Sequence, residues 1–290
     1  FVVILGAVLD SWRLRWLSDD AFISFRYAQH LVEHGELAYN AGELVEGYTN
    51  FAWTLLMALG MVVGLEPEFF AHLMSLLCAL ATYCVVYIGV GKDREMGGSL
   101  GGLAAVIWMA VCSHLRVFST SGLETSSFCL CVATVSVGML KHRPSWVLLG
   151  GSLAFLSRPE GALFALVGAF LLPSGKAKNR ALCIGVTIAT AYAVWKLWYF
   201  GDVLPNTFYA KAVGDNWRQG ATYLWLHARG YMFYVFVPLL WWSLRRERPR
   251  FVIYVGLCAS VYLLHIWKAG GGFMVGRLLL PLVPLAAICV

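Results

Sequence analysis

The sequence has few charged residues and none of the paired cysteine spacings that bind zinc or build a disulfide framework. Only 13% of its 290 residues are charged, 60% are hydrophobic, and the mean hydropathy is +0.70. Too few polar side chains remain to cover a soluble globule. The eight cysteines all lie in apolar stretches, where we expect them to act as small packing residues. These deficits predict an all-α polytopic membrane protein.

The net charge of +6 is concentrated in a few short linkers. Half of the 22 basic residues lie in four of them: Lys92, Arg94, Lys141, Arg143, Lys176, Lys178, Arg180, Arg245, Arg246, Arg248 and Arg250. Short basic linkers between apolar segments are typical of cytoplasmic loops in membrane proteins. The charge therefore indicates topology and gives no reason to expect a nucleic-acid partner.

Ten apolar segments are expected to form membrane helices, and an eleventh is too short to span. The ten cover residues 1–16, 67–91, 98–113, 123–140, 145–157, 160–173, 180–200, 229–244, 250–267 and 277–290. The eleventh, 51–64, would reach about 21 Å as a helix, against a hydrocarbon core of about 30 Å. We therefore expect it to be interfacial or re-entrant, which places Asp19 and Asp20 on the side opposite the basic linkers.

A second length problem concerns residues 145–173, which carry Arg158, Pro159 and Glu160 at their centre. One long helix through this region would put basic linkers on both faces of the membrane. A hairpin broken at Pro159 returns them to one face. The sequence therefore predicts a hairpin whose tip presents Arg158 to the outer side.

Together these choices predict an integral membrane protein whose unusual residues lie on the outer face. Of the 16 acidic residues, 12 fall on that face: Asp19, Asp20, Glu33, Glu36, Glu43, Glu46, Glu66, Glu68, Glu124, Glu160, Asp202 and Asp215. Residues 1–290 are expected to form one transmembrane domain, with an extracytoplasmic loop at 17–66. The chain starts without methionine at Phe1 and stops in an apolar run at Val290, so we expect it to be cut at both ends.

Six short motifs carry a resemblance to a known family. They are DDAFISFRYA at 19–28, VEGYTNF at 45–51, SGLET at 121–125, SRPEG at 157–161, LPNTFYAK at 204–211 and GGGFMVGR at 270–277. In this order they resemble the GT-C glycosyltransferases related to mycobacterial terminal β-(1→2)-arabinofuranosyltransferases. The resemblance implies a GT-C-like helix bundle with juxtamembrane helices in the first outer loop.

The same resemblance implies an activity and its partners. The implied activity is transfer of a sugar, which is arabinofuranose in those relatives, from a polyprenyl-phosphate donor to a cell-envelope glycan or lipid acceptor. The resemblance implies that this transfer takes place at the extracytoplasmic face of a bacterial inner membrane. It assigns the catalytic role to Asp19 and Asp20. The chain departs from the family at Gly272, where relatives usually have an acid, and at Val275, where they have proline.

The residues themselves suggest the same chemistry. Transfer from a sugar phosphate to a hydroxyl needs a carboxylate to take the proton and cations to stabilise the leaving phosphate. Asp19 or Asp20, at the head of an amphipathic helical pattern, could be the base. For the donor phosphate and the substrates the candidates are Arg158, Lys211, Arg277, Glu46, Glu124, Glu160 and Asn206. No cofactor is required by the sequence, no metal ligands are assigned, and a divalent metal stays open.

Each candidate also has a structural alternative. The paired aspartates could cap an interfacial helix, and Glu124 could simply begin one. Arg158 and Glu160 could pair with each other across the turn. The remaining candidates also have structural roles open to them: Asn206 could cap a turn, Lys211 could reach toward lipid head groups and Arg277 could anchor a helix end.

Two further hypotheses remain to be weighed. His30 and His34, four residues apart on one helix, could reach the same metal, although no third ligand is evident. The rival function is a transporter or flippase of a lipid-linked saccharide. Such a protein would place its acids near the middle of the membrane and repeat half of its sequence, and neither feature is found.

Overall fold

The structure, a computed structural model, describes residues 2–92, 97–211, 216–230 and 248–289, and every regular element in these ranges is helical. The elements are α1 (Val2–Arg13), α2 (Asp19–His34), α3 (Phe51–Val62), α4 (Pro67–Gly91), α5 (Gly98–Val111), α6 (Ser113–Phe118), α7 (Thr125–Leu140), α8 (Pro144–Ser157), α9 (Gly161–Leu171), α10 (Lys176–Phe200), α11 (Asn206–Lys211), α12 (Trp217–Gly230), α14 (Pro249–Ala269), the 3-10 helix η2 (Arg277–Leu279) and α15 (Leu282–Ala287).

The described helices form the bundle that the apolar segments predict. Three of them, α4, α10 and α14, are long and apolar enough to cross a membrane. Five shorter apolar helices, α3, α5, α7, α8 and α9, accompany them. The expected span at 67–91 coincides with α4, and the expected span at 250–267 lies within α14. The all-α polytopic membrane architecture is thus confirmed, and the protein is an integral membrane protein.

Helix α7 forms the centre of the bundle. Most of its residues are buried, and it packs against α4, α8, α9, α14 and α15. A helix that is apolar all round is stable only when neighbours cover every face. Two of its cysteines, Cys129 and Cys131, are fully buried, as expected of small packing residues, whereas Cys84 and Cys183 on other helices are exposed.

Residues 145–173 form the expected hairpin. Helix α8 ends at Ser157, the chain turns through Arg158, Pro159 and Glu160, and α9 begins at Gly161 and packs back along α8. Proline lacks a backbone N–H and disfavours a helical conformation in the residue before it, so the helix ends at this point. The backbone of Arg158 is extended, with φ −157° and ψ 140°.

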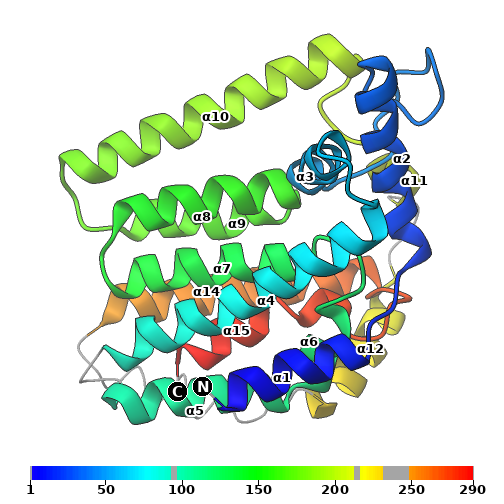
Figure 1. Cartoon of the computed structure of the whole chain (residues 1–290). Helices are drawn as coiled ribbons and strands as arrows, with labels where there is room; N and C mark the ends of the chain where they lie inside the picture. Colours follow the sequence, from blue (N-terminus) through cyan, green and yellow to red (C-terminus); the bar gives the residue numbers. More distant parts are fainter. Residues whose placement is uncertain (1, 93–96, 212–215, 231–247, 290) are drawn as a thin grey trace.

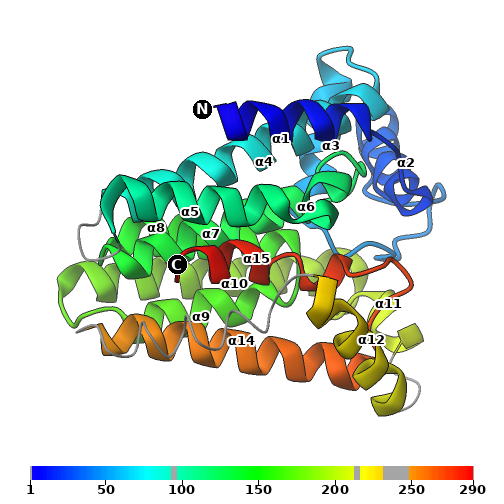
Figure 2. The same cartoon turned by 90° about the horizontal axis from the view of Figure 1, so that it is seen from below.

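One end of the bundle carries helices that lie across the others. Figures 1 and 2 show α2, α3, α11 and α12 gathered at this end, with α3 seen end-on in Figure 1 while α7, α8 and α10 run across the view. Residues 51–62 therefore form a short helix lying across the bundle end, as expected of an interfacial segment. The turns α7–α8 and α9–α10, which contain basic linkers, lie at the opposite end.

Some expectations about elements were wrong in detail. Residues 277–290 were expected to form one span, but the structure has the 3-10 helix η2 followed by the short helix α15. Pro281 and Pro284 each lack a backbone N–H, which works against one continuous helix here. The segment 98–113 ends early at Val111, and α6 follows. The span expected at 229–244 lies almost entirely outside the described residues.

Candidate active site

The connection 119–124 fixes the position of α2 at the bundle end. Its polar residues are buried, and the carbonyl of Ser121 accepts a hydrogen bond from the Ser18 N–H at 3.0 Å. Gly122 adopts a φ of 77°, and a Cβ there would lie 2.5 Å from the Leu17 side chain. Only glycine fits both the backbone angle and the space. The chain thereby brings the start of α2 next to Glu124.

Glu124 is the centre of a buried polar cluster. Its side chain is 4% exposed, and it forms an ion pair of 2.7 Å with Arg277 Nη2 and one of 3.3 Å with Arg158 Nη1. Asn50 Nδ2 donates to its other oxygen at 3.0 Å. Burial alone would raise the pKa of Glu124, but Arg277 and Arg158 outweigh burial and keep it below its ordinary value. Glu124 therefore stays ionised and joins three distant segments.

Asn50 connects this cluster to α2. It precedes the first turn of α3, and its amide exchanges hydrogen bonds with Ser24 of α2 at 3.0 and 3.2 Å. Both residues are buried. Neither Asn50 nor Ser24 was among the sequence candidates, although each lies inside one of the six motifs.

Arg277 presents three different contacts. Its Nε donates to Thr125 Oγ1 at 2.9 Å, Nη2 pairs with Glu124, and Nη1 points at the sulfur of Met274 at 3.3 Å. A thioether is a weak acceptor, so Nη1 is the nitrogen with the weakest partner of the three. Burial lowers the pKa of Arg277, while the carboxylates of Glu124 and Asp20 act in the opposite direction.

Arg158 and Glu160 pair with each other as well as with their neighbours. Arg158 Nη2 donates to Glu160 Oε1 at 3.1 Å, and its guanidinium carbon lies 5.6 Å from the centre of the Phe128 ring. His265 Nε2 lies 3.8 Å from the same Glu160 oxygen. Burial alone would raise the pKa of Glu160, but the charge and hydrogen bonds of Arg158 lower it to about 2. The structural alternative foreseen for this pair is therefore realised, together with the contact to Glu124.

The two aspartates at the start of α2 have different surroundings. Asp19 is exposed, and its Oδ1 accepts from the Asp20 N–H at 3.0 Å and from Ser18 Oγ at 3.3 Å. Asp20 is half-buried, and its charge acts on the pKa of Arg277. Ser18 is the N-cap residue of α2, and no side chain makes a cap hydrogen bond there. The second carboxylate oxygen of Asp19 has no hydrogen-bond partner in the part of the chain that the structure describes.

Glu46 belongs to a second buried cluster. It forms an ion pair of 2.6 Å with Lys196 near the end of α10, and both side chains are buried. Burial raises the pKa of Glu46, and Lys196 opposes this. The backbone N–H of Asn206 donates to the Glu46 carbonyl at 2.9 Å, so Asn206 enters through its backbone. The side chain of Lys211, another candidate, lies outside the described part of the chain.

Lys196 is a member of this cluster that the sequence candidates did not include. A single lysine late in a 25-residue apolar helix is the signal that points to it, because an intramembrane ionisable residue needs a partner. His30 and His34 lie with ring centroids 5.2 Å apart. Within the described ranges no group of three His, Cys, Asp or Glu side chains is arranged to hold a metal.

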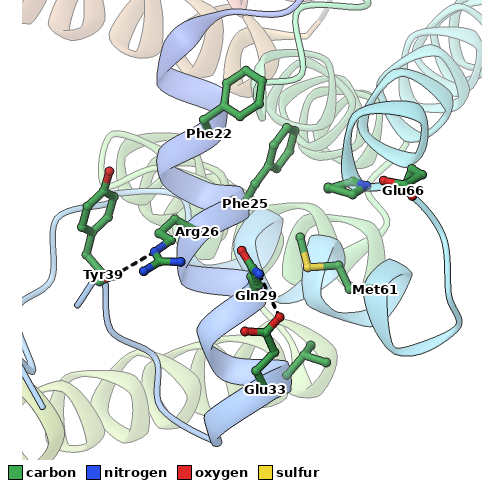
Figure 3. Close-up of a pocket in the computed structure, with 10 residues that line it drawn as sticks. Phe22, Phe25, Arg26, Gln29, Glu33, Tyr39, Met61 and Glu66 are labelled. Carbon is green, nitrogen blue, oxygen red and sulfur yellow. Dashed lines mark hydrogen bonds between the residues drawn. The ribbon is translucent and has the colours of Figure 1, made fainter. Parts of the chain in front are cut away.

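A shallow groove runs along the exposed face of α2. Its volume is about 610 Å³, and Phe22, Arg26, Gln29 and Glu33 line it from one helix face (Figure 3). Tyr39 lies on one side of these residues; Met61 and Glu66 lie on the other (Figure 3). Its exposed polar and aromatic side chains make this a mixed surface open to solvent.

A second, more apolar pocket lies beside Arg277. It has a volume of about 420 Å³ and is formed by α6, the residues before α2 and the segment preceding η2. Its walls are Trp16, Ser113, His114, Val117, Phe118, Phe273, Met274 and Val275. Met274 is both a wall of this pocket and the partner of Arg277 Nη1, so the guanidinium lies at its edge.

Comparison with solved structures identifies the fold. The crystal structure of ArnT from Cupriavidus metallidurans bound to undecaprenyl phosphate matches 99% of this chain and 58% of that one, with a TM-score of 0.69 at 16% identity. The same enzyme in the apo state matches with a TM-score of 0.67. The chain has the GT-C fold. This fold is that of a polytopic membrane protein, in agreement with the helical bundle and its three helices long enough to cross a membrane.

Curated relatives agree with this GT-C assignment. A terminal β-(1→2)-arabinofuranosyltransferase of Mycobacterium tuberculosis is 30% identical over 93% of this chain and 51% of its own length. One of Corynebacterium glutamicum is 26% identical over 96% of this chain and 47% of its own length. The chain thus spans about half the length of these relatives, and the resemblance carried by the six motifs is confirmed. No family model matches the sequence.

Proposed function

We propose that this protein is a glycosyltransferase that moves a sugar from a polyprenyl-phosphate donor to a hydroxyl of a cell-envelope glycan or lipid. The curated relatives named terminal β-(1→2)-arabinofuranosyltransferase favour arabinofuranose as the sugar. One observation carries the proposal. Arg277 contacts Met274, a wall of the apolar pocket, its pKa responds to the charge of Asp20 on α2, and its Nη1 donates to a thioether, a weak acceptor.

The donor phosphate would bind at Arg277. Its Nη1 faces Met274, and a phosphate oxygen accepts a far stronger hydrogen bond than a thioether sulfur does. The first units of a polyprenyl tail would then occupy the pocket lined by Trp16, Phe118 and Phe273. The ArnT structure bound to undecaprenyl phosphate supports a lipid-phosphate donor for this fold.

The reaction would begin with proton transfer to Asp19. The free carboxylate oxygen of Asp19 takes the proton of the acceptor hydroxyl, and the oxygen of that hydroxyl forms a bond to the anomeric carbon of the donor sugar. The bond from this carbon to the phosphate oxygen breaks, and polyprenyl phosphate leaves. Arg277 stabilises the negative charge that develops on the leaving phosphate. Asp20, which is half-buried and whose charge acts on Arg277, would help to orient the guanidinium.

The remaining candidates are assigned positioning roles. Glu124 fixes Arg277 and Arg158, and Glu160 fixes Arg158 in turn. Glu46 secures the segment before α3 to α10. Lys211 stays a candidate for the donor phosphate on sequence grounds, and the scheme leaves a divalent metal open.

The site is assigned to the extracytoplasmic face of a bacterial inner membrane. Its helices α2 and α3 lie at the end of the bundle opposite the α7–α8 and α9–α10 turns, which contain basic linkers (Figure 1). Basic loops stay on the cytoplasmic side. This arrangement suits a donor and an acceptor that both belong to the cell envelope.

Transfer by the purified protein in proteoliposomes tests the proposal. With a polyprenyl-phosphate arabinofuranose donor, wild type should yield a glycosylated product, and Asp19→Asn should lower kcat about a thousandfold without changing the Tm. Glu43→Gln, which removes an exposed carboxylate from the connection between α2 and α3, is the control and should retain wild-type kcat. Equal rates for wild type and Asp19→Asn would contradict the assignment. Movement of the lipid-linked sugar across the bilayer without any product would favour the transporter instead.

A further inference from the structure

Helix α12 has an exposed face that the proposed chemistry does not use. Gly220 and Tyr223 are buried on the side of the helix that packs against α14. Arg218, Trp225 and Arg229 are exposed, and their spacings of seven and four residues place them together on the opposite side. The guanidinium carbon of Arg229 lies 5.5 Å from the centre of the Trp225 ring, which is 66% exposed. The helix contains no acidic residue, so this face is basic and aromatic.

The start of α12 lies at the end of α14 (Figure 2). Trp267 Nε1 donates to the Trp217 carbonyl at 2.9 Å, and the two indole rings meet edge to face with centroids 5.1 Å apart. A Cβ on Gly220 would overlap the Trp267 carbonyl oxygen, so the two helices are in close contact. Because α14 is long and apolar enough to cross a membrane and ends at Ala269, this contact places the start of α12 at the level of the lipid head groups.

An exposed apolar stripe on α14 leads to the same level. Leu257, Val261 and Leu264 are each about half exposed and are spaced four and three residues apart, and the exposed Lys268 follows four residues later. Such spacing makes one continuous line along a helix. From Leu257 to Lys268 it is about 16 Å long at 1.5 Å per residue, which is about half of a hydrocarbon core of roughly 30 Å. An acyl chain of one leaflet can therefore lie along this α14 stripe, with its head group at Lys268.

The charges at this level favour an anionic head group. Arg218 follows Trp217 and Lys268 follows Trp267, so the contact between the two tryptophans brings two cations to the same place. Within the described ranges, Arg218 and Lys268 form no ion pair with a carboxylate. A phosphate accepts strong hydrogen bonds from both kinds of side chain. A zwitterionic head group brings a cation of its own, which these two residues repel.

We propose that α12 and the end of α14 form a binding site for an anionic phospholipid. It belongs to the leaflet at this end of the bundle, which is the outer leaflet in the orientation assigned above. One acyl chain lies along the α14 stripe, the head-group phosphate binds Arg218 and Lys268, and Trp225 lies in the head-group layer beside it. None of these residues takes part in the proposed transfer, so the lipid site does not depend on that reaction.

Quenching of a probe on α12 by labelled lipids tests the site. In a variant without the eight native cysteines, a fluorophore is attached through Ala221→Cys, an exposed position of α12. Nanodiscs contain equal amounts of phosphatidylglycerol and phosphatidylcholine, with a nitroxide near the head group of one or the other. Labelled phosphatidylglycerol should quench about threefold more than labelled phosphatidylcholine, and Arg218→Gln with Lys268→Gln should remove the difference. Arg13→Gln with Arg15→Gln, which removes two exposed cations after α1, is the matched control and should keep it.

The other outcomes would overturn the site. Equal quenching by the two lipids before any charge is removed would contradict its anionic preference. Absence of quenching by both would place α12 outside the bilayer and leave its exposed face to a protein partner. Loss of the preference when a small amount of polyprenyl phosphate is added would assign the site to the sugar donor. An equal loss in both double variants would mean that net charge, and no site, attracts the lipid. Should the first double variant fail to fold, Lys268→Gln alone must still reduce the preference.

Discussion

At the scale of single residues, the site depends on how four charges share one buried space. Glu124, Arg158, Glu160 and Arg277 form a chain of ion pairs with side chains that are at most 21% exposed. Buried charges of this kind stabilise a structure only while every partner is present. Removing one carboxylate leaves an arginine uncompensated, so the cluster acts as a unit that fixes Arg277.

Glu160 provides a pH test of this cluster. Its pKa is lowered to about 2 in the folded protein, against an ordinary value near 4.5, so its contribution to stability is complete above about pH 4.5 and is lost as the pH falls toward 2. Glu160→Gln should lower the free energy of unfolding by about 2 kcal/mol at pH 7. Thermal unfolding of both proteins in detergent from pH 7 to pH 3 should show the difference shrinking below pH 4.5. A difference that is constant with pH would contradict this.

The sequence predicted the members of this cluster better than their contacts. Glu124, Arg158, Glu160 and Arg277 were all candidates because charged residues next to apolar segments are costly without a purpose. Their convergence on Glu124 could not be predicted, since it depends on bringing positions far apart in the chain within about 3 Å of each other. Asn50 was missed for the same reason.

At the scale of elements, short connections determine where the site residues lie. The tip between α8 and α9 contains Arg158 and Glu160, and its close packing depends on Gly161. A Cβ on Gly161 would lie 2.2 Å from the carbonyl carbon and oxygen of Ala154, both fixed in the backbone of α8. This contact cannot be relieved by a side-chain rotation.

Gly161→Ala should therefore destabilise the protein by about 3 kcal/mol and reduce transfer, because the backbone has to shift and move Arg158. The control is Gly256→Ala on α14, where a Cβ would meet nothing within 4 Å. That change should be neutral or stabilise by up to about 1 kcal/mol through helix propensity. Thermal unfolding and the transfer assay measure both effects. Similar stabilities and transfer rates for the two variants would contradict the packing argument.

The segment between α2 and α3 is connected to α10 by the Glu46 and Lys196 pair. Glu46→Gln and Lys196→Met should each cost about 3 kcal/mol, because each leaves one buried charge without a partner. The double variant should cost clearly less than the sum of the two, since it buries no charge. A double-mutant cycle in denaturant, with limited proteolysis of residues 35–50, measures this. Additive costs would mean that the two residues do not interact.

Long apolar helices were predictable, whereas short ones were not. The bounds of α4 follow from a long, mostly apolar run between Pro67 and Gly91. The hairpin followed from Pro159 and from the placement of basic linkers. Helix α6, with only six residues, and the break of 277–290 into η2 and α15 depend on packing against other helices, and their local sequence looks as apolar as that of a span.

At the scale of the whole molecule, the two ends of the bundle differ in chemistry. Helices α2, α3, α11 and α12 lie at one end, and turns that contain basic linkers lie at the other (Figures 1 and 2). Under the positive-inside rule the turns with basic linkers mark the cytoplasmic end, so the proposed site would lie at the opposite, outer end. The different chemistry of the two ends could be predicted from the positions of the charged residues, once α3 was taken as an interfacial helix and residues 145–173 as a hairpin.

Labelling of single cysteines tests this orientation. In a variant without the eight native cysteines, Glu43→Cys should react with a membrane-impermeant maleimide in intact spheroplasts, because it lies between α2 and α3. Ser174→Cys, exposed between α9 and α10, should react only after permeabilisation. The reverse pattern would place the site in the cytoplasm and contradict the assignment.

The central claim is that Arg277 binds the phosphate of a lipid-linked donor beside the aspartates of α2. A cryo-EM structure of the protein with polyprenyl phosphate tests it most directly. We expect the phosphate within hydrogen-bond distance of the Arg277 guanidinium, with the first isoprene units between Trp16, Phe118 and Phe273. Lipid phosphate bound elsewhere, with Arg277 Nη1 still on the sulfur of Met274, would contradict it.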